Sequence, residues 1–393
     1  MQVTICGGGN AAHALAGILA ARQGLQVNVY TPFGDEARRW QRGMARYHGI
    51  CVRSRDGTVV GKPRRVSANA EDVVPGSEMI LLALPAFAHQ AILADIAGYL
   101  DEAIWVGALP ARGAFDLCAK EMLEGGAHLP SLFGMQTLPW ACRIQKYGQE
   151  VEILGTKAVV DLAAWPPQHA KDLASQLSDL LGVPILPAAS FLSLTLADTG
   201  QIIHPGIMFG LFHKWNGSAY QEAPLFYHGV DEFTVAILEQ LSVEVRSVAA
   251  ALQSRYPDLD LSAVRPLLEW FRRAYPDDIQ DPSTLRGCIL TNRSYAGLKA
   301  PMRTANGGLA PDFQARYLGE DVPYGLIVTR GLAELAGIAT PVMDEVIIWS
   351  QGQLGKVYLA GGKLQGDDIG ATRAPQRYGY HDLKNLMQTF YLQ

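Results

Sequence analysis

The sequence predicts an α/β protein in which a doubly wound parallel sheet is followed by an all-helical domain. In the first third of the chain, short apolar runs alternate with helical patterns, which is typical of parallel strands joined by crossover helices. After about residue 190, long helical patterns dominate and strand alternation nearly disappears. We therefore expect two domains, residues 1–190 and residues 191–393, of which the first carries the sheet.

The expected elements follow the hydrophobic pattern along the chain. Strands are predicted over residues 2–6, 25–30, 79–84, 103–106, 151–154, 157–162 and 183–186. Helices are predicted over residues 11–23, 35–44, 86–100 and 166–181, and in the second domain over residues 233–252, 261–275, 324–336 and 341–354. Pro184 and Pro187 flank the last strand and suit a sheet edge, because proline cannot donate a hydrogen bond to a neighbouring strand.

The composition excludes several classes of protein. Of the 393 residues, 49% are hydrophobic and 18% are charged, which favours a large buried core over disorder. A net charge of −5 gives no basic face for a nucleic acid, and the apolar run at residues 79–88 is too short to span a membrane. The five cysteines are scattered without metal-ligand spacing, so we expect reduced thiols, a cytoplasmic location and no metal.

The first predicted strand leads directly into a glycine-rich turn. Gly7-Gly8-Gly9-Asn10-Ala11-Ala12 fits the pattern G-x-G-x-x-A at the start of a helix. Gly7 permits the tight turn, Gly9 lets a pyrophosphate approach the backbone, and Ala12 allows close packing of the helix on the strand. The free N–H groups and the helix dipole would hold the phosphates through Gly7, Gly9, Asn10, Ala11 and Ala12. Such turns also close ordinary βα units, but here the flanking elements agree with a dinucleotide-binding Rossmann domain.

The choice of dinucleotide depends on the end of the second strand. The usual acidic residue is missing there, and Tyr30-Thr31 stand in its place. Asp35 and Glu36 follow a few residues later, and either could reach the ribose hydroxyls and would repel a 2′-phosphate. Arg38 and Arg39 act in the opposite sense, although a solvated position suits them equally. The pattern favours NAD over NADP, with Asp35 as the candidate contact.

Residues 85–89 close a central strand where the nicotinamide half of the cofactor is expected to pass. Pro85 and Phe87 are therefore candidate cofactor contacts. His89 could line the same crevice, or it could be an ordinary histidine at the start of a helix.

Nine sequence blocks together carry a family resemblance that runs almost from end to end. They are GGGNAAHALAG, ALPAFAHQ, TLPWACR, IIHPGIMFG, EAPLFYHGVD, DDIQD, TNRSYAGL, PDFQARYLGEDVPYG and TRAPQRYG. In this order and spacing the chain resembles the octopine dehydrogenase family. The resemblance implies an N-terminal Rossmann domain, an all-helical C-terminal domain and a substrate cleft between them. The C-terminal half also distantly resembles the helical domains of ketopantoate reductase and glycerol-3-phosphate dehydrogenase.

A histidine and an aspartate are the candidate catalytic pair. His204 precedes Pro205, and a residue before proline is pushed away from helical geometry, so we expect His204 at a helix break facing a cleft. A core histidine is the alternative, and Asp321 could be only the N-cap of the following helix. The resemblance implies that Asp321 pairs with His204. A carboxylate on one imidazole nitrogen fixes the tautomer, which leaves the other nitrogen to exchange a proton near neutral pH.

The resemblance also implies substrate contacts. Arg316 would grip a carboxylate through a two-pronged hydrogen bond, the alternative being a salt bridge with Glu320 or Asp312. Trp270 matches an aromatic wall of the amino-acid pocket, whereas a helical tryptophan is otherwise more often part of a core. Gln136-Thr137 belong to a block that we place after the last strands of the nucleotide domain.

Two positions depart from the pattern of the octopine-forming enzymes. They carry a glutamate where this chain has Gln136, and that carboxylate recognises the guanidinium of arginine. Arg112 stands where they have a glutamine that touches the oxo acid, and an added cation could bind a carboxylate or the sulfonate of taurine. Asp198 could in turn restore an acid for a basic donor. These departures favour a small neutral amino acid or taurine over arginine.

The predicted activity is the NADH-dependent condensation of a 2-oxo acid such as pyruvate with an amino acid through an imine, in a monomer or homodimer. His204 would polarise the oxo-acid carbonyl and move protons during condensation. One alternative is a 2-oxo acid or ketopantoate-type reductase that uses no amine. Another is a nucleotide-sensing Rossmann protein without turnover, in which loss of the catalytic pair is expected, whereas His204, Asp321 and Arg316 are all present.

Overall fold

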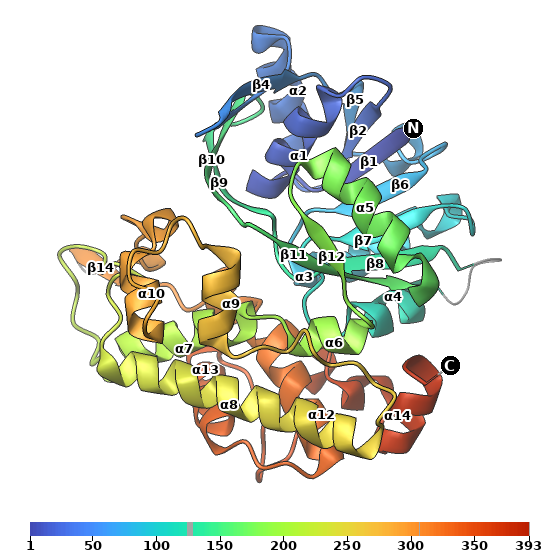
Figure 1. Ribbon diagram of the computed structural model, residues 1–393. Coiled ribbons are helices and arrows are strands. Elements are labelled where there is room, and N and C mark those ends of the chain that lie inside the picture. The colour runs from blue at the N-terminus through green and yellow to red at the C-terminus, as the bar shows by residue number, and fades with distance from the viewer. Residues whose placement is uncertain (124–128, 306, 393) are drawn as a thin grey trace. The chain divides into compact units, whose positions relative to one another are not determined.

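The computed structural model describes residues 1–123, 129–305 and 307–392, and the chain divides into two compact units. Unit 1 comprises residues 1–111 and 115–191, and unit 2 comprises residues 112–114 together with the chain from residue 192 onward. The three residues 112–114 thus leave unit 1 and belong by their contacts to unit 2. Figure 1 shows the sheet-containing and the helical part of the chain.

Unit 1 is built on an eight-stranded sheet in the order β12-β11-β8-β7-β6-β1-β2-β5, in which the β8–β11 pair is antiparallel and every other pair is parallel. Its strands are β1 (Gln2–Cys6), β2 (Gln26–Tyr30), β5 (Arg65–Ser67), β6 (Met79–Leu82), β7 (Trp105–Ala108), β8 (Ser131–Met135), β11 (Val160–Trp165) and β12 (Ile185–Pro187). From β1 the chain proceeds to β2 on one side, and from β6 it proceeds to β7 on the other. The strand order therefore reverses beside β1, which is where α/β sheets of this kind bind ligands.

Five helices connect the strands of unit 1, with short 3₁₀ turns between them. They are α1 (Asn10–Ala20), α2 (Glu36–Tyr47), α3 (Ala86–Ile96), α4 (Phe115–Leu123) and α5 (Ala170–Leu181), and the turns are η1 (Ala70–Asp72), η2 (Ala97–Tyr99) and η3 (Pro167–His169). Right-handed crossovers that run in opposite directions along the sheet place α1 and α3 on opposite faces. The predicted doubly wound fold is therefore confirmed.

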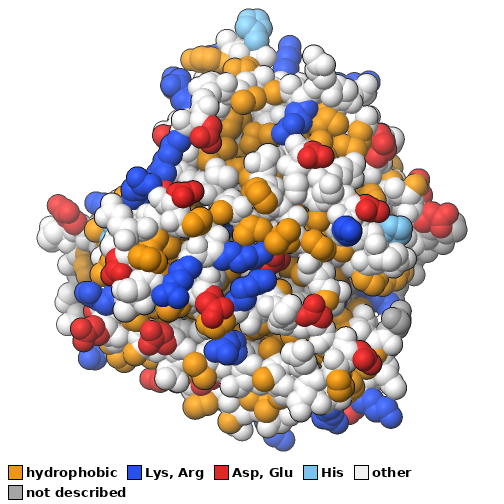
Figure 2. Space-filling model, viewed as in Figure 1, with side chains coloured by type: hydrophobic (Ala, Val, Ile, Leu, Met, Phe, Trp, Pro, Cys, Tyr) orange, Lys and Arg blue, Asp and Glu red, His pale blue; other side chains and the backbone are white. Residues whose placement is uncertain are grey.

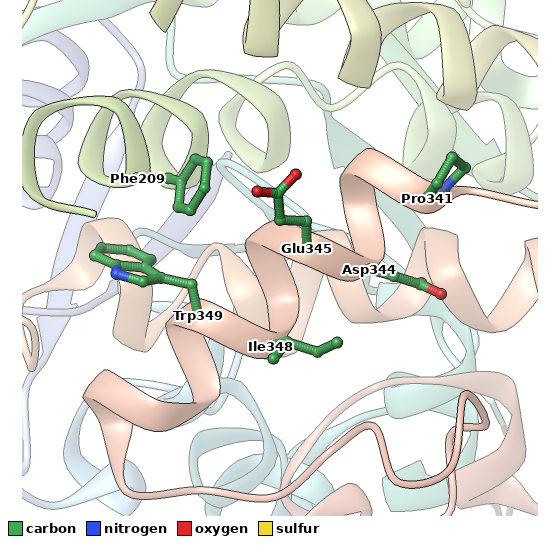
Figure 3. A pocket seen from close by; sticks show the side chains of 6 residues that line it. All are labelled: Phe209, Pro341, Asp344, Glu345, Ile348 and Trp349. Carbon is green, nitrogen blue, oxygen red and sulfur yellow. The ribbon is translucent and has the colours of Figure 1, made fainter. Parts of the chain in front are cut away.

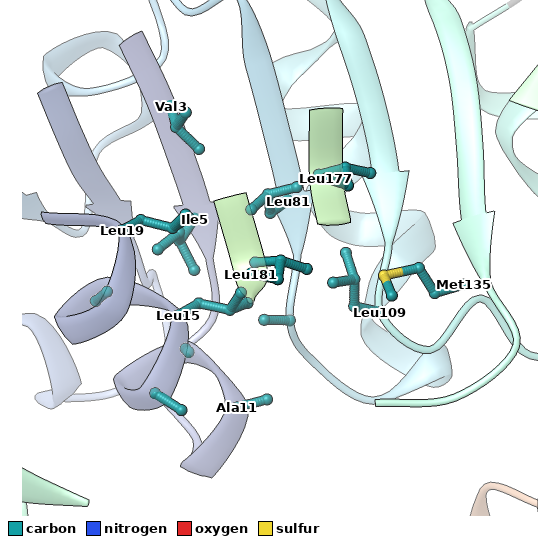
Figure 4. Packing of buried hydrophobic residues seen from close by; sticks show 14 of the residues in the cluster. Val3, Ile5, Ala11, Leu15, Leu19, Leu81, Leu109, Met135, Leu177 and Leu181 are labelled. Atoms are coloured by element: carbon teal, nitrogen blue, oxygen red, sulfur yellow. The ribbon is translucent and has the colours of Figure 1, made fainter. Parts of the chain in front are cut away.

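The core of unit 1 explains why its central strands read as continuous apolar runs. Val3 and Ile5 of β1 are completely buried, as is Leu81 of β6. They pack against leucines of α1 and α5 (Figure 4), namely Leu15, Leu19, Leu177 and Leu181. Strands covered by helices on both faces need apolar residues at every position rather than at alternate ones.

A second sheet of four strands, in the order β4-β3-β10-β9, lies in unit 1 and was largely missed by the sequence prediction. Its strands are β3 (Ile50–Ser54), β4 (Gly57–Gly61), β9 (Trp140–Lys146) and β10 (Glu150–Thr156). All four carry exposed residues beside buried ones, so they lack the apolar runs that marked the main sheet. Residues 136–139 lie between β8 and β9, and Trp140 is the first residue of β9, so their expected place after the last strands is wrong.

A buried histidine ties the glycine-rich turn to this second sheet. His13 of α1 is inaccessible to solvent, and its ring stacks on Trp40 of α2 with 3.8 Å between the centroids. The Gly148 N–H donates to His13 Nε2 at 2.9 Å, and Nδ1 lies 3.0 Å from the Gly9 carbonyl. Because a backbone N–H can only donate, Nε2 carries no proton and Nδ1 donates to Gly9. The imidazole is thereby held neutral.

We expect this histidine to make unit 1 sensitive to acid. Burial lowers the pKa of His13 to about 4 from an ordinary value of 6.5. As the pH falls below 6.5 the unfolded chain takes up the proton first, so stability is lost progressively down to about pH 4. The loss approaches about 3 kcal/mol. Urea unfolding measures the free energy of unfolding between pH 7.5 and 4.5. This free energy should fall less steeply with decreasing pH in His13→Gln than in the wild type, and equal slopes would contradict this role.

Unit 2 consists mainly of helices that pack around the long helix α8 (Glu232–Arg255). The others are α6 (Phe191–Leu196), α7 (Gly200–Phe212), α9 (Leu267–Ala274), α10 (Leu285–Thr291), α11 (Arg316–Gly319), α12 (Ile327–Ala336), α13 (Pro341–Leu354) and α14 (Leu383–Phe390). Shorter turns are η4 (Arg293–Tyr295), the π turn η5 (Val322–Leu326), η6 (Ile369–Ala371) and η7 (Pro375–Tyr378). An antiparallel hairpin, β13 (Met302–Ala305) with β14 (Gly308–Pro311), adds two strands that the sequence prediction did not contain.

Two helix predictions in unit 2 need correction. His204 does not lie at a helix break, because α7 continues through Pro205. Proline removes a single N–H from the helix, and the buried side chains on most of α7 hold it in place through packing. The helix predicted over residues 261–275 begins only after Pro266, which stands in extended geometry (ψ 141°) at the N-cap of α9.

On the surface, acidic side chains lie among the lysines and arginines over the face shown in Figure 2. Within the residues that the structure describes, no helix combines the length and the apolar character needed to cross a bilayer. The same residues contain no group of three or more His, Cys, Asp or Glu side chains arranged to hold a metal ion.

Candidate active site

The glycine-rich turn has the geometry that a dinucleotide pyrophosphate requires. Gly7 adopts φ +130°, and a Cβ there would lie 2.5 Å from the Ala83 carbonyl oxygen, so only glycine fits. Among the described residues, and apart from its two chain neighbours, no atom lies within 4 Å of a Cβ built on Gly9, which leaves that backbone open to approach. In the part of the chain described, no side chain caps the start of α1, so its first-turn N–H groups are available to an anion. The turn therefore fits a dinucleotide.

Of the other residues predicted in this turn, Ala11 and Ala12 are buried in the first turn of α1, where their small side chains permit close packing. Asn10 makes a further contact through its side chain, because its Oδ1 accepts the Ile144 N–H at 2.8 Å. That side chain holds strand β9 beside the turn, and the backbone N–H and the Nδ2 group of Asn10 remain to donate to a phosphate.

The acid beside the turn is Glu36 rather than Asp35. Asp35 is exposed and pairs with Arg39 at 3.8 Å and with Arg42 at 4.0 Å. The Thr31 hydroxyl donates to Glu36 Oε2 at 2.6 Å, and a Cβ built on Gly8 would overlap that carboxylate. The structure thus brings the end of β2 and the glycine-rich turn together through Glu36.

Tyr147 also faces this turn. Its hydroxyl oxygen would lie 2.8 Å from a Cβ on Gly8, is buried, and has no hydrogen-bond partner among the residues described. Burial raises the pKa of Tyr147, so the phenol keeps its proton and remains a donor. The guanidinium of Arg39 lies 4.2 Å above its ring. A polar ligand at Gly8 would find one acceptor in Glu36 and one donor in Tyr147.

The residues predicted to meet the nicotinamide half lie at the start of α3. Pro85 is the N-cap residue and Phe87 is 55% exposed. His89 is completely buried, with Nε2 3.2 Å from the Leu84 carbonyl oxygen and its ring against Phe115. His89 is therefore a histidine packed at a helix start and does not line a crevice.

The central feature of unit 2 is a histidine paired with an aspartate. His204 Nδ1 lies 2.8 Å from Asp321 Oδ2. Asp321 is only 1% exposed and makes no side-chain bond to the helix that follows it, so it is not an N-cap in the ordinary sense. Because an ionised carboxylate can only accept, Nδ1 carries the proton and donates to Asp321. The tautomer of His204 is thus fixed.

Two tyrosines that the sequence analysis did not single out complete this arrangement. The hydroxyl of Tyr227 lies 3.1 Å from His204 Nε2 and donates to it when the imidazole is neutral. Tyr317 stacks on the imidazole with 4.3 Å between ring centroids. Both occur in blocks that carry the family resemblance, beside His228 and Arg316, but nothing in the sequence indicates which ring meets His204.

Arg112 lies at the centre of a buried cluster of carboxylates. Its Nη1 is 2.8 Å from Asp321 Oδ1 and 3.2 Å from Asp198 Oδ1, and its Nε is 3.4 Å from Glu320 Oε1. Burial acts to lower the pKa of Arg112, but the carboxylates of Asp321, Asp198 and Glu320 outweigh it and raise that pKa. Burial also raises the pKa of Asp198, with Arg112 acting against it. Arg112 and Asp198 were each expected to contact substrate, but in the structure they are paired with each other.

The remaining predicted substrate residues lie in different surroundings. Arg316 Nε pairs with Glu320 at 2.6 Å, while its side chain is 52% exposed and its Nη groups meet no partner among the described residues. Trp270 is buried in α9 with its ring edge-on to Phe271. In unit 1, Gln136 is buried at the end of β8, and Thr137 is half-buried beside it.

A shallow apolar hollow of unit 2 does not belong to this arrangement. It is lined by Phe209, Pro341, Asp344, Glu345, Ile348 and Trp349 (Figure 3). Phe209 follows His204 by five residues on α7, which is about 140° around the helix axis. The hollow therefore opens on a different face of α7 from the histidine.

A doubly wound sheet with a dinucleotide-type glycine turn, together with a helical unit that carries a histidine–aspartate pair, defines the class of the nicotinamide-dependent dehydrogenases. A family model described as NAD/NADP octopine/nopaline dehydrogenase, alpha-helical domain, matches residues 187–354. Octopine dehydrogenase of Pecten maximus is 39% identical, with 98% of each chain covered. Tauropine dehydrogenase of Arabella iricolor is 37% identical, with 98% of this chain and 99% of that one covered. The chain belongs to the octopine dehydrogenase family.

The solved structures agree with this assignment. A structure of octopine dehydrogenase with NADH and L-arginine superimposes with a TM-score of 0.87 at 37% identity, covering 100% of this chain and 99% of that one. A ketopantoate reductase from Ralstonia eutropha, at 16% identity, superimposes with a TM-score of 0.57 over 90% of this chain and all of its own. The second likeness is one of fold alone.

Proposed function

We propose that this chain is an NADH-dependent opine dehydrogenase that joins a 2-oxo acid, pyruvate, to an amino acid by reductive condensation. The observation that carries the proposal is the contact of 2.8 Å between His204 Nδ1 and Asp321 Oδ2, in a chain that matches octopine and tauropine dehydrogenases along almost its whole length. Octopine dehydrogenase has also been solved with NADH and pyruvate, at 36% identity to this chain.

In this proposal the cofactor, when bound, supplies the hydride that reduces the carbon–nitrogen double bond. The free N–H groups at the start of α1 hold its pyrophosphate. His204 handles protons at Nε2, since Nδ1 is occupied by Asp321. The amine attacks the oxo-acid carbonyl as the carbonyl oxygen takes a proton from Nε2. The nitrogen of the adduct then returns a proton to Nε2, and that proton goes to the departing hydroxyl as water leaves. Tyr227 donates to Nε2 in the resting arrangement and yields that position to substrate.

The proposed amino donor is a small neutral amino acid or taurine rather than arginine. A guanidinium needs an unpaired carboxylate, but Asp198 is paired with Arg112 at 3.2 Å and Gln136 carries no charge. Releasing Asp198 would leave Arg112 with fewer partners in a buried position, at a large cost. Arg316 keeps exposed Nη groups, so we assign it to the carboxylate of one substrate.

We further propose that Glu36 accepts hydrogen bonds from the adenosine ribose and thereby favours NADH over NADPH. Glu36→Gln should weaken NADH binding by about tenfold, because a hydrogen bond to a charged group contributes roughly 1.5–3 kcal/mol. Asp35→Asn serves as the matched control, since Asp35 is exposed and pairs only with arginines of α2. Fluorescence titration with NADH measures both dissociation constants. If Asp35→Asn weakened NADH binding more than Glu36→Gln, Asp35 would be the residue that contacts the ribose.

The activity is tested by steady-state oxidation of NADH with pyruvate alone and with pyruvate plus glycine, alanine, taurine or arginine. The proposal expects oxidation that depends on the amine, with taurine or a small neutral amino acid more effective than arginine. Equal rates with and without amine would identify a simple 2-oxo acid reductase. Absence of turnover under all conditions, with NADH still bound, would favour a nucleotide-sensing protein.

We also propose that the enzyme acts in the cytoplasm on small molecules as a monomer or homodimer. All five cysteines are free thiols, and four of them are buried, which suits a reducing compartment. Light scattering coupled to size exclusion measures the mass of the assembly directly.

A further inference from the structure

The segment that carries Arg112 is held in unit 2 by its backbone as well as by its charge. Arg112 and Ala114 adopt positive φ angles of 61° and 50°, which are unfavourable for residues with a Cβ. The N–H of Gly113 donates to the Tyr324 carbonyl at 2.7 Å, and that of Ala114 donates to the Thr195 hydroxyl at 3.0 Å. Strain of this kind persists only where surrounding contacts impose it, and it is common at functional sites.

The helix that bears His204 is shaped to admit the Arg112 guanidinium. A Cβ built on Gly200, the first residue of α7, would overlap Arg112 Nη1 and lie 3.1 Å from oxygens of both Asp198 and Asp321. Any side chain at position 200 would displace the cation. Gly200 precedes His204 by four residues, about one helical turn, so the cluster lies directly beside the imidazole.

The cluster gathers acidic side chains around Arg112. Three buried carboxylates, those of Asp198, Glu320 and Asp321, face the buried Arg112 and the half-exposed Arg316. Buried charges are costly unless they are paired, so the guanidinium of Arg112 allows these acidic side chains to lie close to the imidazole.

We propose that Arg112 is a positioning residue that holds Asp321 against His204 and that, together with Asp198, it sets the charge beside the dyad. This inference rests on the proposed function of the dyad. Asp321 divides its two oxygens, with Oδ1 on Arg112 and Oδ2 on His204. Without the cation, Asp321 and Asp198 would repel each other and Asp321 would lose the contact that orients it.

A direct role of Arg112 in binding substrate is less consistent with its surroundings. Its side chain is only 7% exposed, and its Nε and Nη1 are both engaged by carboxylates of the chain. From the sequence, Arg112 was expected to bind the oxo acid or a sulfonate. In the structure, Arg112 pairs instead with Asp321, the aspartate that contacts His204.

Other ionisable groups that pack near α7 have partners of their own. Glu244 of α8 accepts the backbone N–H groups of Val342 and Met343 at 2.8 Å each. Asp344 of α13 pairs with Arg330 at 2.5 Å. The phenols that surround His204 are Tyr227, Tyr317 and, stacked on Tyr227, Tyr295, whose pKa is raised by burial.

The inference is tested by the pH dependence of kcat and by the KM for pyruvate in Arg112→Gln, Asp198→Asn and the double variant. Arg112→Gln should lower kcat by about tenfold or more. It should also shift the pH–rate profile upward by roughly one pH unit, because loss of the guanidinium leaves more negative charge beside His204. Asp198→Asn removes a carboxylate and should shift the pH–rate profile downward. The double variant should return it to near the wild-type position, since the two changes in charge cancel. KM for pyruvate should change little.

Arg330→Gln is the matched control, because Arg330 has a side chain 8% exposed and pairs with two carboxylates, Asp344 and Glu334. It should lower the thermal midpoint without moving the pH–rate profile. If Arg112→Gln does not fold, Asp198→Asn and Arg112→Lys carry the test, with activity retained in the lysine variant. A large rise in KM for pyruvate with an unmoved profile would overturn the proposal and make Arg112 a substrate ligand.

The imidazole titration of His204, followed by NMR in the same variants, gives a readout without turnover. An upward shift in Arg112→Gln supports the inference even if the wild type condenses no amine, whereas an unchanged titration in an active enzyme overturns it. Failure of the positioning role and failure of the proposed function are therefore distinguished.

Discussion

Replacement of His204 by alanine is expected to lower kcat by about 10³-fold, within the range that a positioned general acid–base contributes. Asp321 orients this imidazole through a contact of 2.8 Å. Because His204 belongs to unit 2 and the glycine-rich turn to unit 1, NADH binding should change by no more than about twofold. Stopped-flow turnover and fluorescence titration of NADH measure the two quantities separately.

His213→Ala is the control for this variant. His213 lies at the C-terminal end of the same helix, and its Nδ1 contacts the Phe209 carbonyl at 3.0 Å while its ring stacks on Phe233. We expect activity close to that of the wild type. If His204→Ala retained more than a tenth of the wild-type kcat, the imidazole would not be the group that transfers protons.

Replacement of Asp321 by asparagine is expected to have an effect of similar size, roughly 10³-fold in kcat. An amide can present its NH₂ group to Nδ1, which favours the tautomer with the proton on Nε2, and it cannot stabilise the imidazolium. The change also leaves Arg112 with one carboxylate fewer. Measurement of kcat between pH 6 and 9 should show the loss at every pH, because it arises from the tautomer as well as from charge.

Asp231→Asn gives the matched control for Asp321→Asn. Asp231 caps α8 by accepting the Thr234 N–H at 2.8 Å, and asparagine caps helices about as well as aspartate. Its activity should be unchanged. If Asp321→Asn lost activity only through a higher KM, with kcat preserved, the carboxylate would serve substrate binding instead of the dyad.

The parts of the fold that follow local periodicity could be predicted from the sequence. The strand Gln2–Cys6, the glycine turn and the helix after it form one contiguous unit whose apolar pattern reports burial on both sides. The helix Pro341–Leu354 was likewise expected at those bounds, because proline suits a helix's first turn and Gly355 adopts the left-handed conformation that ends it.

The second sheet could not be predicted by the same means. Strand β10 pairs in parallel with β3, about a hundred residues earlier in the chain, and antiparallel with its neighbour β9. Such pairing depends on long-range contacts, and the half-exposed strands carry a weaker hydrophobic signal. The helix break expected at His204 failed for a related reason, since packing around α7 overrides the local effect of Pro205.

In the candidate site, residue types were easier to predict than partners. His204 and Asp321 were paired by family resemblance, and the structure brings them together. Arg112 and Asp198 were singled out individually, but their ion pair joins positions 86 residues apart and depends on the inserted segment at residues 112–114. Tyr227 carries no local signal at all, because only the fold places its hydroxyl on His204 Nε2.

The most direct test of the central claim is the fate of deuterium from NADH labelled at the transferable position, with pyruvate and taurine or alanine as substrates. A reductive condensation predicts one deuterium on the carbon newly bonded to nitrogen in a secondary amine, as read by mass spectrometry. Deuterated lactate without any carbon–nitrogen product would contradict it.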